Sequence, residues 1–317
     1  MYDILVVGGA GVDTIVRVEQ LEIPEGDSVG VPPVVDHVAH TGNGVALGSL
    51  ALGLRTKFID FLGADPQGAL ILDAYRRHGL DFSHLVSPAG TPRAVNLVDA
   101  AGRRFSFYDG RHPADLRLPR AFALPFLERS AHVHLSISNV NRDLYPDIHR
   151  LGVSCSTDLH AWDGRQEHHR QYAFQSDLVF MSVAGCRGGH EAVMRSILAG
   201  GRAVLVAATA GEHGSYLLTR DDAAPRHFPA VDPGAPIVDS NGAGDAFVTG
   251  FLSRWSARRP VEECMLAGAV SGAHACTTAG THTSFIDAAR LQAELAAHQA
   301  GQGGVDGPSA APQTGEG

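Results

Sequence analysis

The chain has 317 residues, of which 44% are hydrophobic and 19% charged, so it has enough apolar material for one large α/β domain or two ordinary ones. Its formal net charge of −9 argues against a nucleic acid or an anionic membrane surface as the partner. No apolar run reaches the length of about 18 residues that a membrane span requires.

The amino terminus and the cysteines indicate a cytoplasmic protein. The first residues include an acid, Asp3, and no basic stretch, which is typical of a first strand rather than a signal peptide. The four cysteines form no CxxC pair, and we expect reduced, buried thiols.

The first third of the chain predicts alternating strands and helices. Residues 3–13 are a β-branched run that ends in glycines, as a buried strand does before a loop. Proline-bounded strands are expected within 17–40, away from the main sheet. A packed helix is expected over 44–54 and a strand over 56–63, followed by a helix that Gly79 closes.

The rest of the chain predicts a hairpin and then further alternation. Residues 93–110 read as strand, Ala-Gly turn and strand. Continuous apolar runs, such as 178–180 and 204–208, are typical of parallel strands covered on both faces. We therefore expect an α/β fold with a doubly wound, mostly parallel sheet, helices on both faces, and a small β-rich lid from about 15–40 and 93–110.

Domain organisation is expected to be simple. Residues 1–299 would form one domain that includes both lid segments. Residues 300–317 are rich in Gly, Pro and Ser and almost without apolar residues, which predicts a disordered tail.

The stretch VDSNGAGDAFVTGF, residues 238–251, places very small residues and an acid at the start of an apolar helix. Exposed amides at a helix start form an anion site, which the helix dipole strengthens. Asp245 lies in the first turn, beside that site. The pattern suits a phosphoryl group in transit and a carboxylate that takes a proton from its acceptor. Alternatively, Asp245 only compensates the helix dipole.

This stretch is similar to a known signature. Asp239-Ser-Asn-Gly-Ala-Gly-Asp245 resembles the DTxGAGD motif of the ribokinase/phosphofructokinase-B (PfkB) family of carbohydrate kinases. Residues 42–68 resemble the family's N-terminal signature, and 8–13 resemble its first-strand motif. Residues 208–217 resemble its nucleotide loop T-x-G-x-x-G, and TTAGTHTSF at 277–285 lies where the family has its cation and adenine segment.

The resemblance implies a ribokinase-like fold and an ATP-dependent kinase that phosphorylates a hydroxyl of a sugar or sugar derivative. Asp245 would be the general base, and the amides of Gly242, Ala243 and Gly244 would hold the transferring phosphoryl group. The other implied site residues are Asp13, Gly42, Asn43 and Gly44 for the acceptor, and Thr209, Gly211, Gly214 and Ser271 for the nucleotide.

The resemblance also implies Mg²⁺ and a K⁺ site beside the anion site. The residues that match the K⁺ site are Asp239, Ala275, Thr278, Gly280 and Ser284. A homodimer through the lid is an expected assembly.

The chain departs from the family pattern at several positions. Gly44 stands where the family has an Asn, and Gly11 replaces another Asn commonly paired with the first-strand acid. The N-x-x-E motif that helps organise Mg²⁺ is replaced by Ser182 and Gly185. These changes predict either an altered acceptor or a weak enzyme, and a metal environment that is weaker or rearranged.

Three other functions fit parts of the sequence. A nucleoside kinase would share the fold, with the aromatic residues of the hairpin beside its acceptor. A non-catalytic sugar-sensing protein would explain the missing N-x-x-E motif. A dinucleotide-binding turn at 6–13 has glycines at positions 9 and 11 but Thr14 where the third glycine belongs, which argues against a dehydrogenase.

Overall fold

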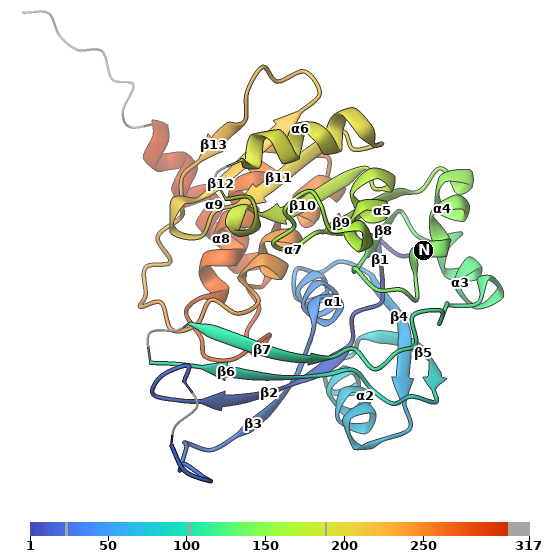
Figure 1. Ribbon diagram of the computed structural model, residues 1–317. Coiled ribbons are helices and arrows are strands. Elements are labelled where there is room, and N and C mark those ends of the chain that lie inside the picture. The colour runs from blue at the N-terminus through green and yellow to red at the C-terminus, as the bar shows by residue number, and fades with distance from the viewer. Residues whose placement is uncertain (23–24, 101–102, 188, 304–317) are drawn as a thin grey trace, which may run out of the picture.

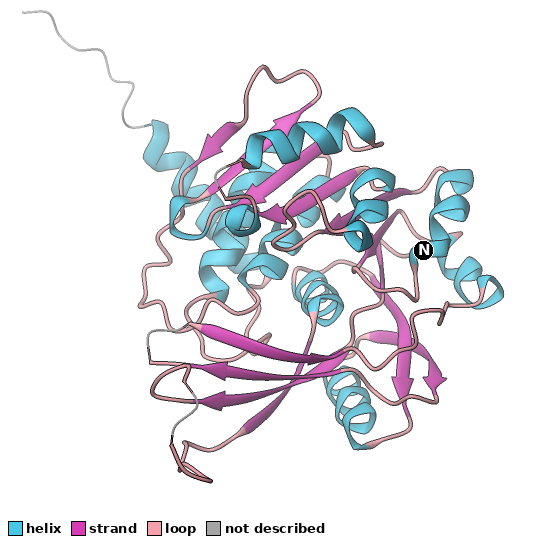
Figure 2. Ribbon diagram, viewed as in Figure 1, coloured by secondary structure: helices cyan, strands magenta, loops and turns pink. Residues whose placement is uncertain are grey.

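The computed structural model describes residues 1–22, 25–100, 103–187 and 189–303, and it contains two sheets (Figures 1 and 2). The larger sheet has nine strands in the order β13-β12-β11-β10-β9-β8-β1-β4-β5. Its strands are β1 (Ile4–Val7), β4 (Thr56–Gly63), β5 (Asp81–Ser87), β8 (His132–Leu135), β9 (Ser154–Asp158), β10 (Leu178–Ser182), β11 (Leu205–Thr209), β12 (Ser215–Thr219) and β13 (Arg226–Phe228).

Seven adjacent strands of this sheet are parallel to one another, namely β11, β10, β9, β8, β1, β4 and β5. The other two, β12 and β13 at one edge, pair antiparallel. The chain starts at β1, builds β4 and β5 on one side, and then returns to place β8 on the other side. In open α/β sheets, ligands bind at the carboxyl ends of the strands near such a reversal of order.

The helices cover both faces of the large sheet, as the sequence predicts (Figure 2). One face packs against α3 (Arg120–Leu127), α4 (Tyr145–Leu151), α5 (Glu167–Gln175) and α6 (His190–Gly200). The other face packs against α1 (Thr41–Ala51), α2 (Pro66–His78), α7 (Ala243–Ser256) and α8 (Val261–Ala275), and α9 (Ala288–Gly303) packs outside α8. Because both faces are covered, every residue of β4 is buried.

The smaller sheet has four strands in the order β3-β2-β6-β7 and corresponds to the predicted lid (Figure 1). Its strands are β2 (Gly11–Arg17), β3 (Val35–Ala39), β6 (Arg93–Val98) and β7 (Arg104–Asp109). The expected hairpin is the antiparallel pair β6–β7. Strand β2 follows β1 after three residues, so the lid is joined directly to the centre of the large sheet.

Local sequence signals explain most element boundaries. Asp65 caps α2 by accepting a hydrogen bond from the Gly68 amide at 2.8 Å, and Gly79 ends the helix at φ 70°. The helix α9 continues to Gly303, four residues into the predicted tail. The remainder of that tail, 304–317, lies outside the described residues.

Candidate active site

The GAG stretch begins α7. Gly242 adopts φ 80° at the N-cap, a left-handed conformation that favours glycine, and no side chain in the described chain caps the helix. The amides of the first turn therefore have no side-chain partner, which is the arrangement that binds anions. Asp245 follows in the first turn and is only 8% exposed.

Asp245 lies next to a second carboxylate and an imidazole. His282 Nε2 is 2.8 Å from Asp245 Oδ2. Asp158, the last residue of β9, has its Oδ2 3.9 Å from the position that a Cβ would take on Gly244. Burial and the Asp245 carboxylate raise the pKa of Asp158, while nearby His160 lowers it. Two acids thus flank the start of α7.

A cleft of about 520 Å³ lies between the large sheet and the lid. Its floor is formed by residues after β1, β8 and β9, which are Gly9, Ala10, Ser136, Ile137, Ser138, Asn139 and His160. Its lid wall is formed by alternate residues of β6 and β7, namely Ala94, Asn96, Arg104, Ser106 and Tyr108. This volume and position are typical of small-molecule sites.

Asp13, which the family resemblance matched to acceptor binding, lines this cleft. Its Oδ1 is 3.4 Å from His40 Nε2, and the His40 ring packs on Tyr108 with ring centroids 5.5 Å apart. Tyr108 therefore faces the cleft. Phe105 and Phe107 lie on the opposite face of the lid and are 54% and 59% exposed, so they are not beside the acceptor cleft.

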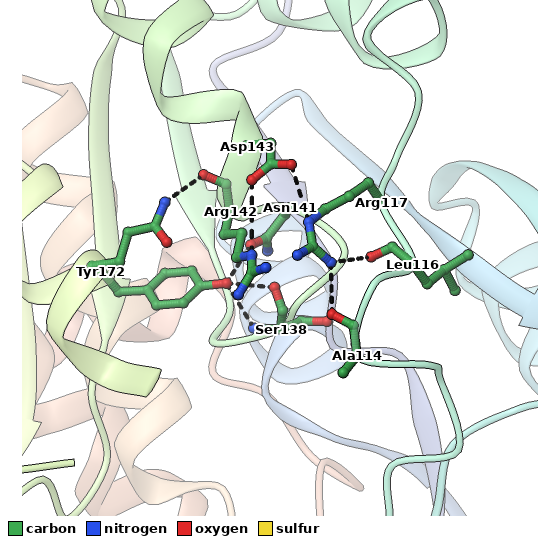
Figure 3. Close-up of polar contacts among 9 residues, drawn as sticks. Ala114, Leu116, Arg117, Ser138, Asn141, Arg142, Asp143 and Tyr172 are labelled. Atoms are coloured by element: carbon green, nitrogen blue, oxygen red, sulfur yellow. Dashed lines mark hydrogen bonds and ion pairs between the residues drawn. The ribbon is translucent and has the colours of Figure 1, made fainter. Parts of the chain in front are cut away.

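The floor loop after β8 is fixed by a buried network (Figure 3). The Asn141 side chain donates hydrogen bonds to the carbonyls of Val7 and Ser136 at 2.7 and 2.8 Å. Tyr172 donates its hydroxyl proton to an oxygen of this network, because both Asn141 Oδ1, at 2.9 Å, and the Ser138 carbonyl face it. These contacts hold Ser136 and Ser138 rigidly beneath the cleft.

Asp60 is a buried carboxyl beneath the same cleft. It accepts hydrogen bonds from the backbone amides of Ala10 and Phe61, both at 2.8 Å. Burial raises the pKa of Asp60 to about 7, although these hydrogen bonds act in the opposite direction. Asp60 thereby anchors the start of β2 to β4.

The lid contacts the anion site directly. The guanidinium of Arg104, on β7, donates a hydrogen bond to Asn241 Oδ1. Arg17, on β2, lies 3.9 Å from Asp239. Because Asn241 and Asp239 immediately precede the GAG amides, the position of the lid is linked to that of the anion site.

The residues that match the K⁺ site gather beside this loop. Ala275, Thr278, Gly280 and Ser284 all line one small cavity of about 10 Å³ next to Asn241 and Gly242. Asp239 accepts hydrogen bonds from the amides of Asn241 and Gly280, at 3.0 and 3.1 Å, and so joins the two segments that form the cavity.

The remaining residues that the family resemblance matched to the acceptor and the nucleotide do not line the cleft. Gly42 packs on the Gly8 carbonyl, and Asn43 and Gly44 face His282 rather than the cleft. Thr209 lies at the carboxyl end of β11, followed by a turn in which Gly211 and Gly214 adopt φ 58° and 85°. Ser271 is buried against Gly250 between α8 and α7.

A second hollow of about 540 Å³ lies elsewhere, beside Asp3, Ala131 and Ser154 at the amino ends of β1, β8 and β9. Ligands of open α/β sheets bind at the opposite, carboxyl edge. The cleft under the lid is therefore the candidate active site.

Known proteins share this architecture. The pfkB family carbohydrate kinase model matches residues 183–288. Acarbose 7(IV)-phosphotransferase of Actinoplanes sp. is 46% identical over 290 residues, which cover 91% of this chain and 97% of that protein. The chain belongs to the pfkB family of carbohydrate kinases.

Solved structures agree with this assignment. The microbiome-derived acarbose kinase Mak1 is 45% identical with a TM-score of 0.88, covering 93% of this chain and 99% of that one. Ribokinase from Thermotoga maritima, at 18% identity, has a TM-score of 0.77 over 93% of this chain and all of that chain, and it supports the ribokinase-like fold alone.

The protein is thus a phosphotransferase with an alcohol group as acceptor, and it uses ATP and Mg²⁺ as the family does. Its acceptor is a small molecule of the sugar class. Within the described residues, no helix is long and apolar enough to cross a membrane.

The kinase cannot accommodate the family's N-x-x-E motif. A Cβ on Gly185 would lie 1.9 Å from the Ala161 carbonyl oxygen, so no larger residue fits there. The Ser182 hydroxyl instead accepts a hydrogen bond from the Ala184 amide at 3.3 Å. A carboxylate near the GAG amides comes instead from the neighbouring strand, where Asp158 Oδ2 lies 3.9 Å from the position of a Cβ on Gly244.

Sequence reasoning missed several of these residues. Asp158 had a usable signal, because an acid directly after a buried strand lies at the edge where α/β proteins bind ligands. Arg104, Asn241 and His282 had no such signal, since their contacts join segments far apart in the chain.

The raised pKa of Asp60 predicts a pH-dependent stability. The folded pKa of about 7 exceeds the ordinary value of 3.8, so the folded protein binds more protons than the unfolded chain between these values. This group's contribution to stability therefore falls as pH rises from about 4 to about 7, by up to roughly 1.4 kcal/mol per pH unit. The free energy of unfolding, measured with urea at pH 5 and pH 7, should fall less between these pH values in Asp60→Asn than in wild type.

Asp221 is exposed, so Asp221→Asn removes one carboxylate without changing a buried group and serves as the matched control. Equal falls in wild type and Asp60→Asn would show that Asp60 is ionised in the folded protein throughout this range.

Proposed function

We propose that the acceptor is acarbose or a closely related compound, and that the kinase phosphorylates it at one hydroxyl. The observation that carries this proposal is the identity of 46% and 45%, over nearly whole chains, with two proteins whose names both specify acarbose. The name of the first places the phosphate on position 7 of ring IV, so its acceptor has several rings. The cleft volume of about 520 Å³ is within the range typical of sites for drug-sized ligands.

Asp245 would act as the general base of the transfer. The O–H bond of the acceptor breaks as its oxygen attacks the γ-phosphorus, and the proton passes to Asp245. The bond between this phosphorus and the leaving ADP oxygen breaks in the same step. The amides of Gly242, Ala243 and Gly244 donate hydrogen bonds to the transferring phosphoryl oxygens, where charge develops. The uncapped start of α7 supports this role.

Other chain residues would orient the two substrates. Asp13 and Tyr108, which line the cleft, would contact acceptor hydroxyls. Thr209, Gly211 and Gly214 would contact the nucleotide from the carboxyl edge of the sheet. Ser271 would act only indirectly, through the packing of α8 on α7. We propose that these residues, within a single kinase domain over 1–299, form the complete site.

Asp158 would take part in the magnesium environment. Mg²⁺ keeps several waters and binds mainly through substrate phosphates, and when bound it neutralises part of their charge. Asp158 lies beside Gly244 and could hold one of those waters.

We further propose that K⁺ occupies the small cavity beside Gly242. Its volume of about 10 Å³ is near the minimum that accommodates one water-sized sphere. The cavity adjoins Asn241 and Gly242, so a cation there would fix the loop that carries the GAG amides.

We also propose a homodimer through the outer face of the lid. Phe105 and Phe107 pack edge to face on this surface, with ring centroids 5.0 Å apart, and Val95 lies opposite Phe107 in the sheet. Exposed apolar residues that gather in this way mark interaction surfaces.

The four unpaired cysteines suit the reducing cytoplasm, where we propose the enzyme works.

The acceptor is tested by measuring ADP release with acarbose, fructoselysine, ribose and cytidine. We expect the highest kcat/KM with acarbose, and NMR of the product should show one phosphate on a single hydroxyl.

Asp245→Asn should lower kcat by roughly two to four orders of magnitude, because general acid–base catalysis contributes that much. Affinity for ATP should change little.

Near-normal turnover in Asp245→Asn would show that Asp245 is only a dipole partner. Higher efficiency with cytidine would instead favour a nucleoside kinase, and binding without ADP release from any acceptor would favour a sugar sensor.

Potassium should activate the kinase more than sodium. The expected order of rates at equal ionic strength is K⁺, Na⁺ and then a bulky organic cation that cannot enter the cavity. Asp239→Asn should reduce the difference, because Asp239 joins the two segments around the cavity. Asp232→Asn, in an exposed loop, is the control. Equal rates in all three salts would contradict a K⁺ site.

Sedimentation should show a dimer that depends on the outer lid face. The double variant Phe105→Ser, Phe107→Ser should raise the dimer dissociation constant by at least about tenfold, because buried aromatic residues dominate interface energies. Val86→Ser, at an exposed valine of β5, is the matched control. A monomeric wild type at micromolar concentration would reject this interface.

A further inference from the structure

His282 is a buried histidine that lies between Asp245 and the start of α1. Its side chain is 3% exposed, and its backbone has φ 56°, a conformation that costs a non-glycine residue energy. The Phe285 ring stacks on its imidazole, with centroids 6.2 Å apart. Such a strained position persists only when surrounding contacts determine it, and two hydrogen bonds do so here.

The hydrogen bonds define which imidazole nitrogen carries the proton. Asn43 Nδ2 lies 3.2 Å from the Val38 carbonyl and 3.0 Å from His282 Nδ1. Because the Val38 carbonyl can only accept, the Asn43 group facing it must be the donating NH₂. The same NH₂ faces His282 Nδ1, which therefore accepts. A neutral imidazole then carries its proton on Nε2 and donates it to Asp245 Oδ2, 2.8 Å away.

Two glycines provide the space for this imidazole. A Cβ on Gly44 would lie 2.3 Å from His282 Nε2, and a Cβ on Gly242 would lie 2.9 Å from His282 Cδ2. Gly44 is a position where the family pattern has an Asn. A side chain at position 44 would therefore overlap with the imidazole of His282, so the glycine and the histidine occur together.

We propose that His282 is a positioning residue for Asp245. The imidazole N–H holds Asp245 Oδ2 and leaves Oδ1 to receive the proton of the acceptor hydroxyl, while His282 keeps its own proton throughout. The Asp245 carboxylate can only accept and so requires a proton on Nε2, and Asn43 donates to Nδ1 and so keeps that nitrogen free of a proton. The inference rests on the proposed function of Asp245 as the base.

Kinetics of His282→Leu and His282→Gln test the role. A misplacement of about 1 Å in a reacting group can lower the rate by about 10²-fold. We expect His282→Leu to lower kcat by roughly 10- to 100-fold, with KM values for ATP and acceptor nearly unchanged. His282→Gln keeps an N–H and should restore most of the loss. His149→Leu removes a half-buried histidine bonded to the Gln175 carbonyl, remote from the cleft, and should leave kcat unchanged.

A double-mutant cycle separates positioning from general structural support. In an Asp245→Asn background, His282→Leu should cause little further loss, because the carboxylate that it positions is already gone. Equal losses in both backgrounds would overturn the proposal.

NMR of ¹⁵N-histidine-labelled protein tests the tautomer without measuring activity. We expect His282 to carry its proton on Nε2 alone, and Asn43→Ala, which removes the donor facing Nδ1, to shift the population toward the doubly protonated imidazole and not toward the Nδ1-protonated tautomer. A cationic His282, or an Nδ1-protonated one, at neutral pH in the wild type would overturn the proposal even if His282→Leu failed to fold.

The outcomes also separate this inference from the proposed function. If Asp245→Asn is inactive while folded His282→Leu keeps wild-type kcat, the positioning role fails and the base assignment stands. If Asp245→Asn is fully active, the base assignment fails and the positioning role fails with it.

Discussion

The arrangement of the site depends on keeping the amino end of α7 open while a carboxylate remains in its first turn. An uncapped helix start attracts anions. The side chains that cap helices best are Asp, Asn, Ser and Thr, and any of these would compete with a phosphate for the same amides. The kinase avoids this competition by using Gly242, Ala243 and Gly244 at the start of the helix. One oxygen of Asp245 faces His282, with Oδ2 2.8 Å from Nε2.

Close packing of neighbouring helices makes that helix start rigid. A Cβ on Gly250 would lie 2.3 Å from the Ala267 carbonyl, so α8 approaches the backbone of α7 directly. Gly44 permits a similar approach from α1 on the other side. Because interiors are densely packed, small shifts in α1 or α8 are transmitted to the amides. Ser271 contributes to the site in this way rather than by contact.

Electrostatics alone would disfavour a phosphate here, since Asp158 and Asp245 both lie beside the anion site. Burial raises the pKa of Asp158, nearby His160 lowers it, and the Asp245 carboxylate raises it. Arg104 approaches from the lid and contacts Asn241. The lid therefore brings a positive charge to the loop that precedes the GAG amides.

The sequence was sufficient for most parallel strands of the large sheet, the lid hairpin and the α7 start because each has a local signal, but the antiparallel strands β12 and β13 were not predicted. Continuous apolar runs identify the parallel strands, and small residues before an amphipathic run identify α7. The edge strand β5 is half exposed and has a weaker pattern, so it was not predicted. His282 could not be predicted because its role depends on a left-handed backbone and on contacts with Asn43 and Asp245 from distant segments.

The departures from the family pattern have structural explanations that argue against a loss of catalysis. Gly185 lacks a side chain because the Ala161 carbonyl occupies that space, and Asp158 places an acid near the anion site from the neighbouring strand instead. Gly44 lacks one because His282 occupies that space. A non-catalytic sensor would have no reason to retain an open helix start, a buried base and a histidine held in a strained conformation against that base. These contacts therefore support the proposal that other side chains of the site perform the functions of the missing motif residues.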